Sequence, residues 1–247
     1  MIARVLPHEV ADGATLMAGD EALLDSVAGG APAAVRTYEW SPPTLSLGYF
    51  QRLDEARADP RFADAPIVRR PTGGGAIWHD REITYAVVLP SADPLADRAS
   101  DLYGRINRLL CGILLDAGID ARRRGGDRDP TAPRPMLCFL DRDPEDVVCR
   151  GHKVVGAAQR RRRGAVLQHG SILLGQSPTL PELPGLADLA PMPEGLRSPA
   201  GWVPGLAARL AQGLLPGVVQ GRWSAEELDA SRRLRGAYRG EDWTDRA

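Results

Sequence analysis

A run of three glycines between β-prone segments is the feature that most constrains this chain. Residues 65–90 read APIVRRPTGGGAIWHDREITYAVVLP, a pattern that predicts a strand, a glycine loop and two further strands. Consecutive glycines expose backbone N–H groups and adopt φ angles closed to other residues, so a ligand can lie directly against the main chain. The spacing lacks the Gly-Lys-Ser/Thr ending of a P-loop, and no helix follows as a dinucleotide fingerprint requires. The loop is therefore either a tight connection or a ligand site that is not of the Rossmann kind.

The rest of the chain alternates helical and strand patterns. Apolar spacing predicts helices over residues 11–30, 98–117, 203–215 and 224–238, the last of which opens with a Ser224/Glu227 capping box. Strands are predicted over residues 34–40, 44–50, 136–140 and 146–151, followed by a hairpin over 152–174. We expect an α/β (α+β) fold in which residues 1–247 form a single domain, with a helical C-terminal appendage from about residue 200.

Charge and composition exclude several classes of protein. The formal net charge of −1 offers none of the basic excess that phosphate binding requires, so a nucleic-acid partner is not expected. No apolar stretch reaches the roughly 20 residues needed to span a bilayer, and the N-terminus has no apolar run of signal-peptide length. Three cysteines without C-x-x-C or paired Cys/His spacing indicate neither a disulfide framework nor zinc. We therefore expect a cytoplasmic protein with no membrane partner and no metal.

Lys153 is the only lysine among the 31 lysine and arginine residues. A lysine on a surface strand is normally a solvated charge, but every other cationic side chain in this protein is arginine. An ammonium is a compact point charge that reaches one oxygen in a tight site, where a planar guanidinium does not fit. The composition therefore favours a functional role for Lys153.

Cys138 stands 15 residues before Lys153 and is our candidate nucleophile. An ammonium close to a thiol favours the thiolate, which is the attacking species. The alternative is a buried apolar cysteine without chemistry. Cys111 falls on the apolar stripe of a predicted helix and Cys149 lies in the run DVVCRG, so we interpret both as packing residues.

The arginine run of residues 160–163 and two histidines remain open to two interpretations each. The run is either a solvated hairpin tip or a docking patch for an acidic protein partner. His79 and His169 each lie at a predicted strand end, where a histidine contacts a ligand or forms a structural hydrogen bond.

The glycine motif and the lysine motif resemble those of the biotin/lipoate protein ligase superfamily. RRPTGGGAIWHD is similar to its arginine, Ser/Thr-Gly-Gly-Gly and His-Asp signature, and GHKVVGAAQ followed by LQHGSILL is similar to its lysine motif and His-Gly-Ser strand. The resemblance implies a mixed, largely antiparallel sheet flanked by helices. It also implies an acyl-substrate site formed by Arg70, Thr72, Gly73, Gly74, Gly75, His79, Gly156, Ala158, Gln159, His169, Gly170 and Ser171.

Within the superfamily, the Cys-Phe element at Cys138 resembles that of cysteine-dependent octanoyltransferases of the LipM type. ATP-dependent lipoate-protein ligases usually carry an Arg-x-Asn-Asp element before the lysine strand, and this sequence has no such Asn-Asp. Biotin ligases carry a Gly-Arg-Gly-Arg loop that RRPTGGGA does not offer. The transferase interpretation is therefore preferred.

The resemblance implies that Cys138 and Lys153 are catalytic and that no cofactor is needed. The donor would be octanoyl-acyl carrier protein, and the acceptor a lysine of a lipoyl domain such as glycine cleavage H protein or a dehydrogenase E2 component. Two alternatives remain: a lipoate-protein ligase that uses ATP and Mg²⁺, and a non-catalytic protein that binds lipoyl domains or carriers.

Overall fold

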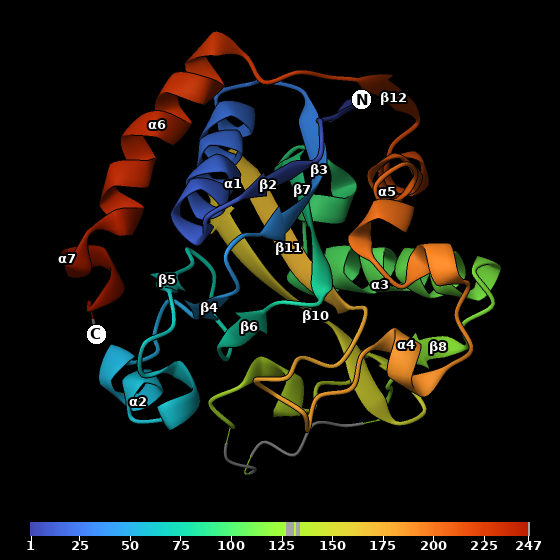
Figure 1. Ribbon diagram of the computed structural model, residues 1–247. Coiled ribbons are helices and arrows are strands. Elements are labelled where there is room, and N and C mark those ends of the chain that lie inside the picture. Colours follow the sequence, from blue (N-terminus) through green and yellow to red (C-terminus); the bar gives the residue numbers. More distant parts are fainter. Residues whose placement is uncertain (127–130, 132–133, 247) are drawn as a thin grey trace.

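The computed structural model describes residues 1–126, 131 and 134–246. A central sheet lies between two layers of helices (Figure 1). Its strands run in the order β12 (Gly217–Gln220), β1 (Ile2–Val5), β3 (Ala33–Trp40), β7 (Glu82–Pro90), β11 (Ala165–Leu173), β10 (His152–Arg162), β9 (Val147–Cys149) and β8 (Ala121–Arg123), with β2 (Glu9–Ala11) beside β3. Among the described strands of this sheet, β1 is parallel to both β12 and β3, and β2 is parallel to β3. The other pairs are antiparallel. The prediction of a mixed, largely antiparallel sheet is confirmed.

A second, smaller sheet carries the glycine loop. It consists of β5 (Ile67–Arg69), β4 (Thr44–Leu47) and β6 (Ile77–His79), with β4 in the middle. The two strands predicted over residues 34–40 and 44–50 therefore separate, because β3 joins the large sheet and β4 the small one. The loop between β5 and β6 contains the three glycines and faces the large sheet's hairpin.

Helices cover both faces of the central sheet (Figure 1). Helices α1 (Gly13–Ala28) and α6 (Ala225–Arg239) lie on one face, and α3 (Ala99–Asp116) and α5 (Leu206–Leu214) on the other. The predicted capping box opens α6, because Ser224 Oγ accepts from the Glu227 N–H and Glu227 Oε2 accepts from the Ser224 N–H. Shorter turns complete the chain: α2 (Leu53–Arg57), α4 (Leu186–Leu189), α7 (Glu241–Thr244), η1 (Pro60–Phe62), η2 (Pro94–Ala96), η3 (Cys138–Leu140), η4 (Glu194–Leu196) and η5 (Pro199–Gly201).

The two-residue period of the strands builds two separate cores. On β7, Tyr85 and Val87 face α3 and α5, whereas Ala86 and Val88 face α1 and α6. Both faces of the central strands are therefore apolar, which explains why β7 reads as a continuous apolar run rather than an alternating one.

The prediction of a strand over residues 136–140 is wrong. Leu137 forms only an isolated bridge with Ala76, and the chain then turns into the 3₁₀ helix η3. Within that turn, the Leu140 N–H donates to the Leu137 carbonyl and the Asp141 N–H donates to the Cys138 carbonyl. A five-residue apolar run has no period that separates a strand from a helical turn, so the sequence pattern was ambiguous here.

Residues beyond 200 contribute strand and helix. Strand β12 pairs with β1 at the sheet edge, and α6 packs along α1. The division into one domain with a helical C-terminal appendage stays a prediction. Among the described residues, no helix combines the length and apolar character needed to cross a membrane.

A buried ion pair attaches α1 to the sheet. Arg36 of β3 and Asp20 of α1 are both fully buried, and Arg36 Nη2 lies 2.7 Å from Asp20 Oδ1. Arg36 also donates to the Leu16 carbonyl oxygen and to Glu9 Oε2, so its guanidinium is held by three different residues. Burial raises the pKa of Asp20, but Arg36 and His169 outweigh that effect and hold the pKa below its ordinary value.

Replacing Arg36 with methionine tests the weight of this pair. Arg36→Met leaves the buried Asp20 carboxylate without its guanidinium partner, and removing one partner of a buried ion pair lowers the free energy of unfolding by about 3–5 kcal/mol. Urea denaturation followed by circular dichroism measures the change. Arg232→Ala, which removes an exposed pair with Asp229 on α6, is the control and should change stability by no more than about 0.5 kcal/mol. Equal stabilities for both variants would show that the buried pair does not fix α1.

Candidate active site

The Lys153 ammonium is buried and has three acceptors around it. Lys153 Nζ lies 2.8 Å from Asp146 Oδ1, 3.0 Å from the Cys138 carbonyl oxygen and 3.5 Å from Cys138 Sγ. An ammonium has three N–H donors, so this set matches its capacity. The residue is only 8% exposed, which excludes the interpretation of a solvated surface charge.

A β-bulge orients this lysine. The pairing of β10 with β9 shifts register between Lys153 and Val155, and both Val154 and Val155 lie in the main core. Without the extra residue, strict alternation would send one of the two valines to the opposite face of the sheet. The bulge thus directs Lys153 toward η3 while its neighbours stay buried.

Charge compensation keeps the lysine protonated. Burial alone disfavours the ammonium, but Cys138 and Asp146 outweigh that effect, and the pKa of Lys153 lies above its ordinary value. Burial raises the pKa of Asp146, and the adjacent ammonium opposes the rise. Asp146 is only 7% exposed, so the pair depends on mutual contact rather than on water.

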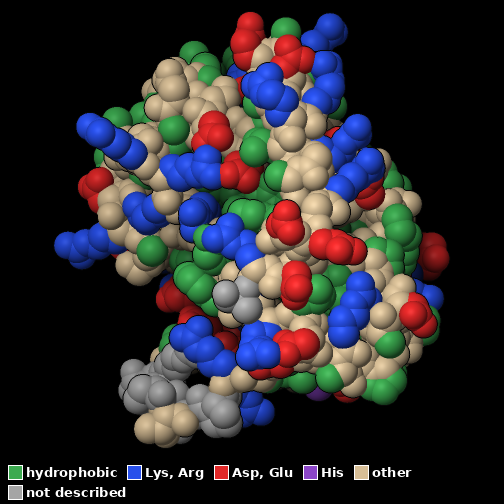
Figure 2. Space-filling view, turned by 90° about the vertical axis from the view of Figure 1, so that its left-hand side faces the viewer, with side chains coloured by type: hydrophobic (Ala, Val, Ile, Leu, Met, Phe, Trp, Pro, Cys, Tyr) green, Lys and Arg blue, Asp and Glu red, His purple; other side chains and the backbone are tan. Residues whose placement is uncertain are grey.

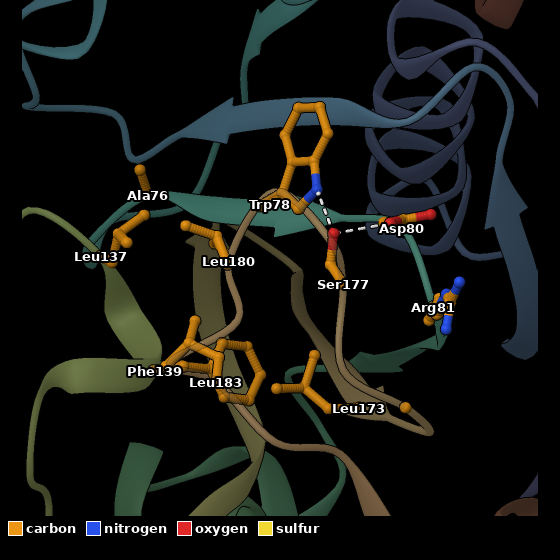
Figure 3. A pocket seen from close by; sticks show the side chains of 11 residues that line it. Ala76, Trp78, Asp80, Arg81, Leu137, Phe139, Leu173, Ser177, Leu180 and Leu183 are labelled. Carbon is orange, nitrogen blue, oxygen red and sulfur yellow. Dashed lines mark hydrogen bonds between the residues drawn. The ribbon is translucent and has the colours of Figure 1, made fainter. Parts of the chain in front are cut away.

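The turn that carries Cys138 is anchored from behind by an apolar pocket. Leu137 and Phe139, on either side of Cys138, line this pocket together with leucines from the segment after β11 (Figure 3). A short chain of hydrogen bonds closes one side of the pocket, from Trp78 Nε1 to Ser177 Oγ and from Ser177 Oγ to Asp80 Oδ2. Its volume of about 20 Å³ leaves room for about one water, so the pocket holds the turn rather than a ligand.

The glycine loop lies directly against the same turn. The Ala76 N–H donates to the Met136 carbonyl oxygen at 2.7 Å, and the Cys138 N–H donates back to the Ala76 carbonyl oxygen at 2.8 Å. Gly75 is needed for this approach, because an added Cβ would lie 2.9 Å from the Cys138 nitrogen. The ligand-site interpretation of the loop thus gains a structural basis beside the candidate nucleophile.

A buried polar chain supports the loop from the other side. Asp20 Oδ2 lies 2.7 Å from His169 Nδ1, and His169 Nε2 lies 2.7 Å from Thr72 Oγ1. Arg70 donates to Thr72 Oγ1 and to the carbonyl oxygens of Gly73 and Gly75. With the proton on Nδ1, His169 donates to Asp20 and accepts from the Thr72 hydroxyl, so each group in the chain has a matching partner. The chain of hydrogen bonds connects α1 to the glycine loop.

His79 has a structural partner set of its own. Its Nε2 lies 2.8 Å from Ser46 Oγ, its Nδ1 lies 3.1 Å from Glu82 Oε1, and its ring stacks on Trp40 at 3.7 Å. Burial lowers the pKa of His79 in spite of the adjacent Glu82, which favours the neutral ring at neutral pH.

Most of the predicted site residues line two adjoining spaces. An outer cleft of about 430 Å³ is lined by Gly73, Gly74, Gly75, Cys138, Lys153, Ala158 and Gln159, together with residues of α3 and of the loop before β9. A small inner cavity of about 20 Å³ is lined by Arg70, His79, Ala158, His169, Gly170 and Ser171, with Met17 of α1 in its wall. Ala158 borders both spaces. Thr72 belongs to the glycine loop and contacts His169, but it lines neither space. Gly156 lies close to the candidate catalytic pair, because a Cβ added to it would lie 3.1 Å from Lys153 Cε and 3.5 Å from Cys138 Sγ.

Sequence reasoning missed several residues of the site. Asp146 pairs with Lys153, Asp20 holds His169, and Asn107 and Tyr103 of α3 line the outer cleft. The position of Asp146 next to β9, which is antiparallel to β10, was the one available signal. Cys149 is buried in the main core as expected, and Cys111 is half-buried against it.

The arginine run does not form a single patch. Arg162 pairs with Glu21 and Asp25 of α1, whereas Arg161 donates to the Ala96 carbonyl oxygen at the opposite face. Arg160 lies over the Tyr49 ring, 5.3 Å from its centroid. On the side of the molecule that Figure 2 shows, basic side chains are interspersed with Asp and Glu side chains.

Comparison with known proteins decides the family. Residues 12–180 match the model of the lipoyl protein ligase A/B catalytic domain, which covers more than half of the chain. The chain belongs to this family. Octanoyltransferase LipM of Kyrpidia tusciae is 35% identical in an alignment that covers 93% of each protein. Octanoyltransferase LipM of Symbiobacterium thermophilum is 40% identical over 187 residues, 73% of this chain and 66% of that protein.

Solved structures of the family share the fold. A putative lipoate protein ligase of T. acidophilum, Ta0514, superposes with a TM-score of 0.76 at 23% identity, over 99% of both chains. Lipoate-protein ligase A bound with ATP has the same TM-score and identity, over 99% of this chain and 98% of that chain. These likenesses support the mixed α/β fold of this chain.

The contact between Gly75 and the Cys138 turn gives a direct test. Gly75→Ala must change the position of the glycine loop relative to the Cys138 turn, and a misplacement on the order of 1 Å costs about 100-fold in rate. Acylation of Cys138 by a small acyl thioester, followed by intact-protein mass spectrometry, measures the effect. Gly112→Ala on α3, where a Cβ meets nothing within 4 Å, is the control and should react as the wild type does. An unimpaired Gly75→Ala would show that the close approach does not position the sulfur.

Proposed function

We infer that this chain is an octanoyltransferase of lipoate biosynthesis, and we propose that Cys138 is its nucleophile. The observation that carries the proposal is the 3.5 Å distance between Cys138 Sγ and Lys153 Nζ at the wall of the cleft. A sulfur nucleophile beside a fixed ammonium suits attack on an acyl carbonyl. The acyl group comes from the thioester of an acyl carrier protein and goes to a lysine of a lipoyl domain, such as glycine cleavage H protein or a dehydrogenase E2 component.

In the first step, the Cys138 thiolate attacks the thioester carbonyl carbon. The new carbon–sulfur bond forms as the bond to the carrier sulfur breaks, and the carrier leaves as a thiolate that takes up a proton. One thioester replaces another, so the step needs no ATP and no metal.

Lys153 stabilises the oxygen that becomes negative during this step. In the free enzyme, one N–H of Lys153 points to Cys138 Sγ. This N–H is released when the sulfur gives its electron pair to carbon, and the same N–H then donates to the nearby oxyanion. The other two donors stay on Asp146 and on the Cys138 carbonyl oxygen, which fix the position of the ammonium. Loss of one such donor costs about 2.7–4 kcal/mol in transition-state stabilisation.

In the second step, the neutral amine of the acceptor lysine attacks the acyl-enzyme. An amide forms, the bond to Cys138 Sγ breaks, and the amine proton returns to the sulfur. Because an amide is more stable than a thioester, the transfer runs toward the lipoyl domain.

The acyl chain extends from Cys138 past Ala158 toward the inner cavity. Ala158 borders both spaces, and a cavity of about 20 Å³ must widen before it can hold an eight-carbon chain. Met17 is the flexible side chain in its wall, since an unbranched thioether adopts many conformations. Each methylene that enters is stabilised by about 0.8 kcal/mol. We place this reaction in the cytoplasm, in keeping with three free cysteines.

The proposal is tested with purified octanoyl-acyl carrier protein and an apo lipoyl domain, without ATP. We expect transfer of the octanoyl group to the lipoyl domain, and an octanoyl adduct on the protein that disappears in Cys138→Ser. Cys111→Ser, which changes a half-buried cysteine that does not line the cleft, should keep both adduct and transfer. Intact-protein mass spectrometry measures both species.

Two other outcomes would replace the proposal. Transfer only from free octanoate with ATP and Mg²⁺, unaffected by Cys138→Ser, would make the protein a lipoate-protein ligase. Binding of both carrier and lipoyl domain without any gain in mass would make it a non-catalytic binding protein.

A further inference from the structure

We propose that Met17 sets the length of the acyl chain that the enzyme accepts, because its side chain forms the movable end wall of the inner cavity. This inference rests on the proposed function, since it concerns the acyl group that Cys138 receives. It assigns a selective role to an apolar side chain of α1 that takes no part in the chemistry.

The inner cavity lies between two apolar clusters. At one end, Ile77 packs with Phe139 and Leu173, two residues that Figure 3 labels. Cys138 packs against this same cluster. At the other end, Met17 belongs to the core between α1 and the central sheet. An acyl chain that enters the cavity from Cys138 therefore ends at the wall that contains Met17.

Two aromatic side chains share this wall with Met17, and hydrogen bonds hold both of them. The Tyr38 hydroxyl donates to Asp20 Oδ2 at 2.8 Å, and Trp40 Nε1 donates to Thr84 Oγ1 at 3.0 Å. Turning either ring away would leave a buried polar group without its partner, which is costly. The two rings therefore keep their positions when a chain enters.

Met17 is held by packing alone. Among the described residues that line the cavity, Met17 and Ile77 are the two that are larger than alanine and carry no hydrogen-bond donor on the side chain. Ile77 is branched at Cβ and therefore stiff, whereas Met17 has an unbranched side chain with three rotatable bonds. Met17 is only 1% exposed, so it fills space that a longer chain would need. Its movement opens the cavity, and its size limits how far the cavity opens.

The dependence of rate on chain length reports where this wall stands. A methylene that enters the apolar cavity raises the rate of acylation about fourfold, which corresponds to about 0.8 kcal/mol. A methylene that reaches the limit of the wall gains nothing and forces neighbouring side chains from their positions. The rate should therefore rise with chain length up to the limit that Met17 sets and then fall.

The test compares hexanoyl, octanoyl and decanoyl thioesters of the same thiol. These donors differ only far from the reacting carbon, so their intrinsic reactivity is nearly equal. Single-turnover acylation of Cys138 at subsaturating thioester, followed by intact-protein mass spectrometry, gives the rate for each chain. We expect the wild type to react fastest with the octanoyl thioester.

Two substitutions of Met17 change the end wall in different ways. Met17→Ala removes a methylene, a sulfur and a methyl group, so the ratio of decanoyl to octanoyl rates should rise about tenfold as two further methylenes enter. Met17→Leu conserves the volume, which a core tolerates, but its branched side chain moves less freely. The ratio of octanoyl to hexanoyl rates should therefore fall severalfold in Met17→Leu.

Met192→Ala is the matched control. Met192 is also buried, but it lies in the core on the other side of the central sheet and does not line the inner cavity. The variant loses the same atoms as Met17→Ala and should keep both wild-type ratios. Any loss of folded protein cancels, because both rates of a ratio are measured on the same variant.

An unchanged ratio of decanoyl to octanoyl rates in Met17→Ala would overturn the inference and leave the proposed function standing, because Cys138 would still be acylated. An equal loss of rate at every chain length would overturn it as well, since Met17 would then only stabilise the fold. If Met17→Ala does not fold, the octanoyl to hexanoyl ratio of Met17→Leu decides in the same way. If no thioester acylates Cys138 in the wild type, the proposed function fails, and the inference that rests on it fails too.

Discussion

The Lys153 ammonium lies inside the protein, between the Asp146 carboxylate and both the carbonyl oxygen and the sulfur of Cys138. A buried charge is costly unless it is paired and its hydrogen-bonding groups are satisfied, and here all three donors have an acceptor. A planar guanidinium carries five donors in a fixed fork and does not fit this three-point set. The geometry therefore explains why one lysine remains in a chain whose other cationic side chains are arginines.

The surrounding structure holds the two sides of this contact in register. The β10 bulge sets the position of the lysine, and the apolar pocket behind Phe139 sets that of the η3 turn. On the far side, the buried chain from Asp20 through His169 and Thr72 connects helix α1 to the glycine loop. In the proposed reaction, groups held in this way need little reorganisation when negative charge develops on the carbonyl oxygen.

Much of this arrangement could be predicted from local patterns, and the remainder depends on tertiary contacts. Helical spacing, the capping box at Ser224 and the β10–β11 hairpin were correctly predicted, because each has a local sequence signal. The turn at Cys138 was wrongly predicted as a strand, since a short apolar run has no diagnostic period. Asp146 and Asp20 were missed because their partners are set by strand pairing and helix packing. The same packing separates Arg161 from Arg162, which a run of four arginines does not reveal.

The most direct test of the central claim is the single-turnover rate of Cys138 acylation by octanoyl-acyl carrier protein in Lys153→Arg. If a compact ammonium is required, the rate falls by about 100-fold or more, to the level of Lys153→Met, although the arginine keeps the positive charge. A thermal unfolding curve close to that of the wild type would show that the loss is not one of folding. A Lys153→Arg rate within a few-fold of the wild type would contradict the account, because any cation near the sulfur would then suffice.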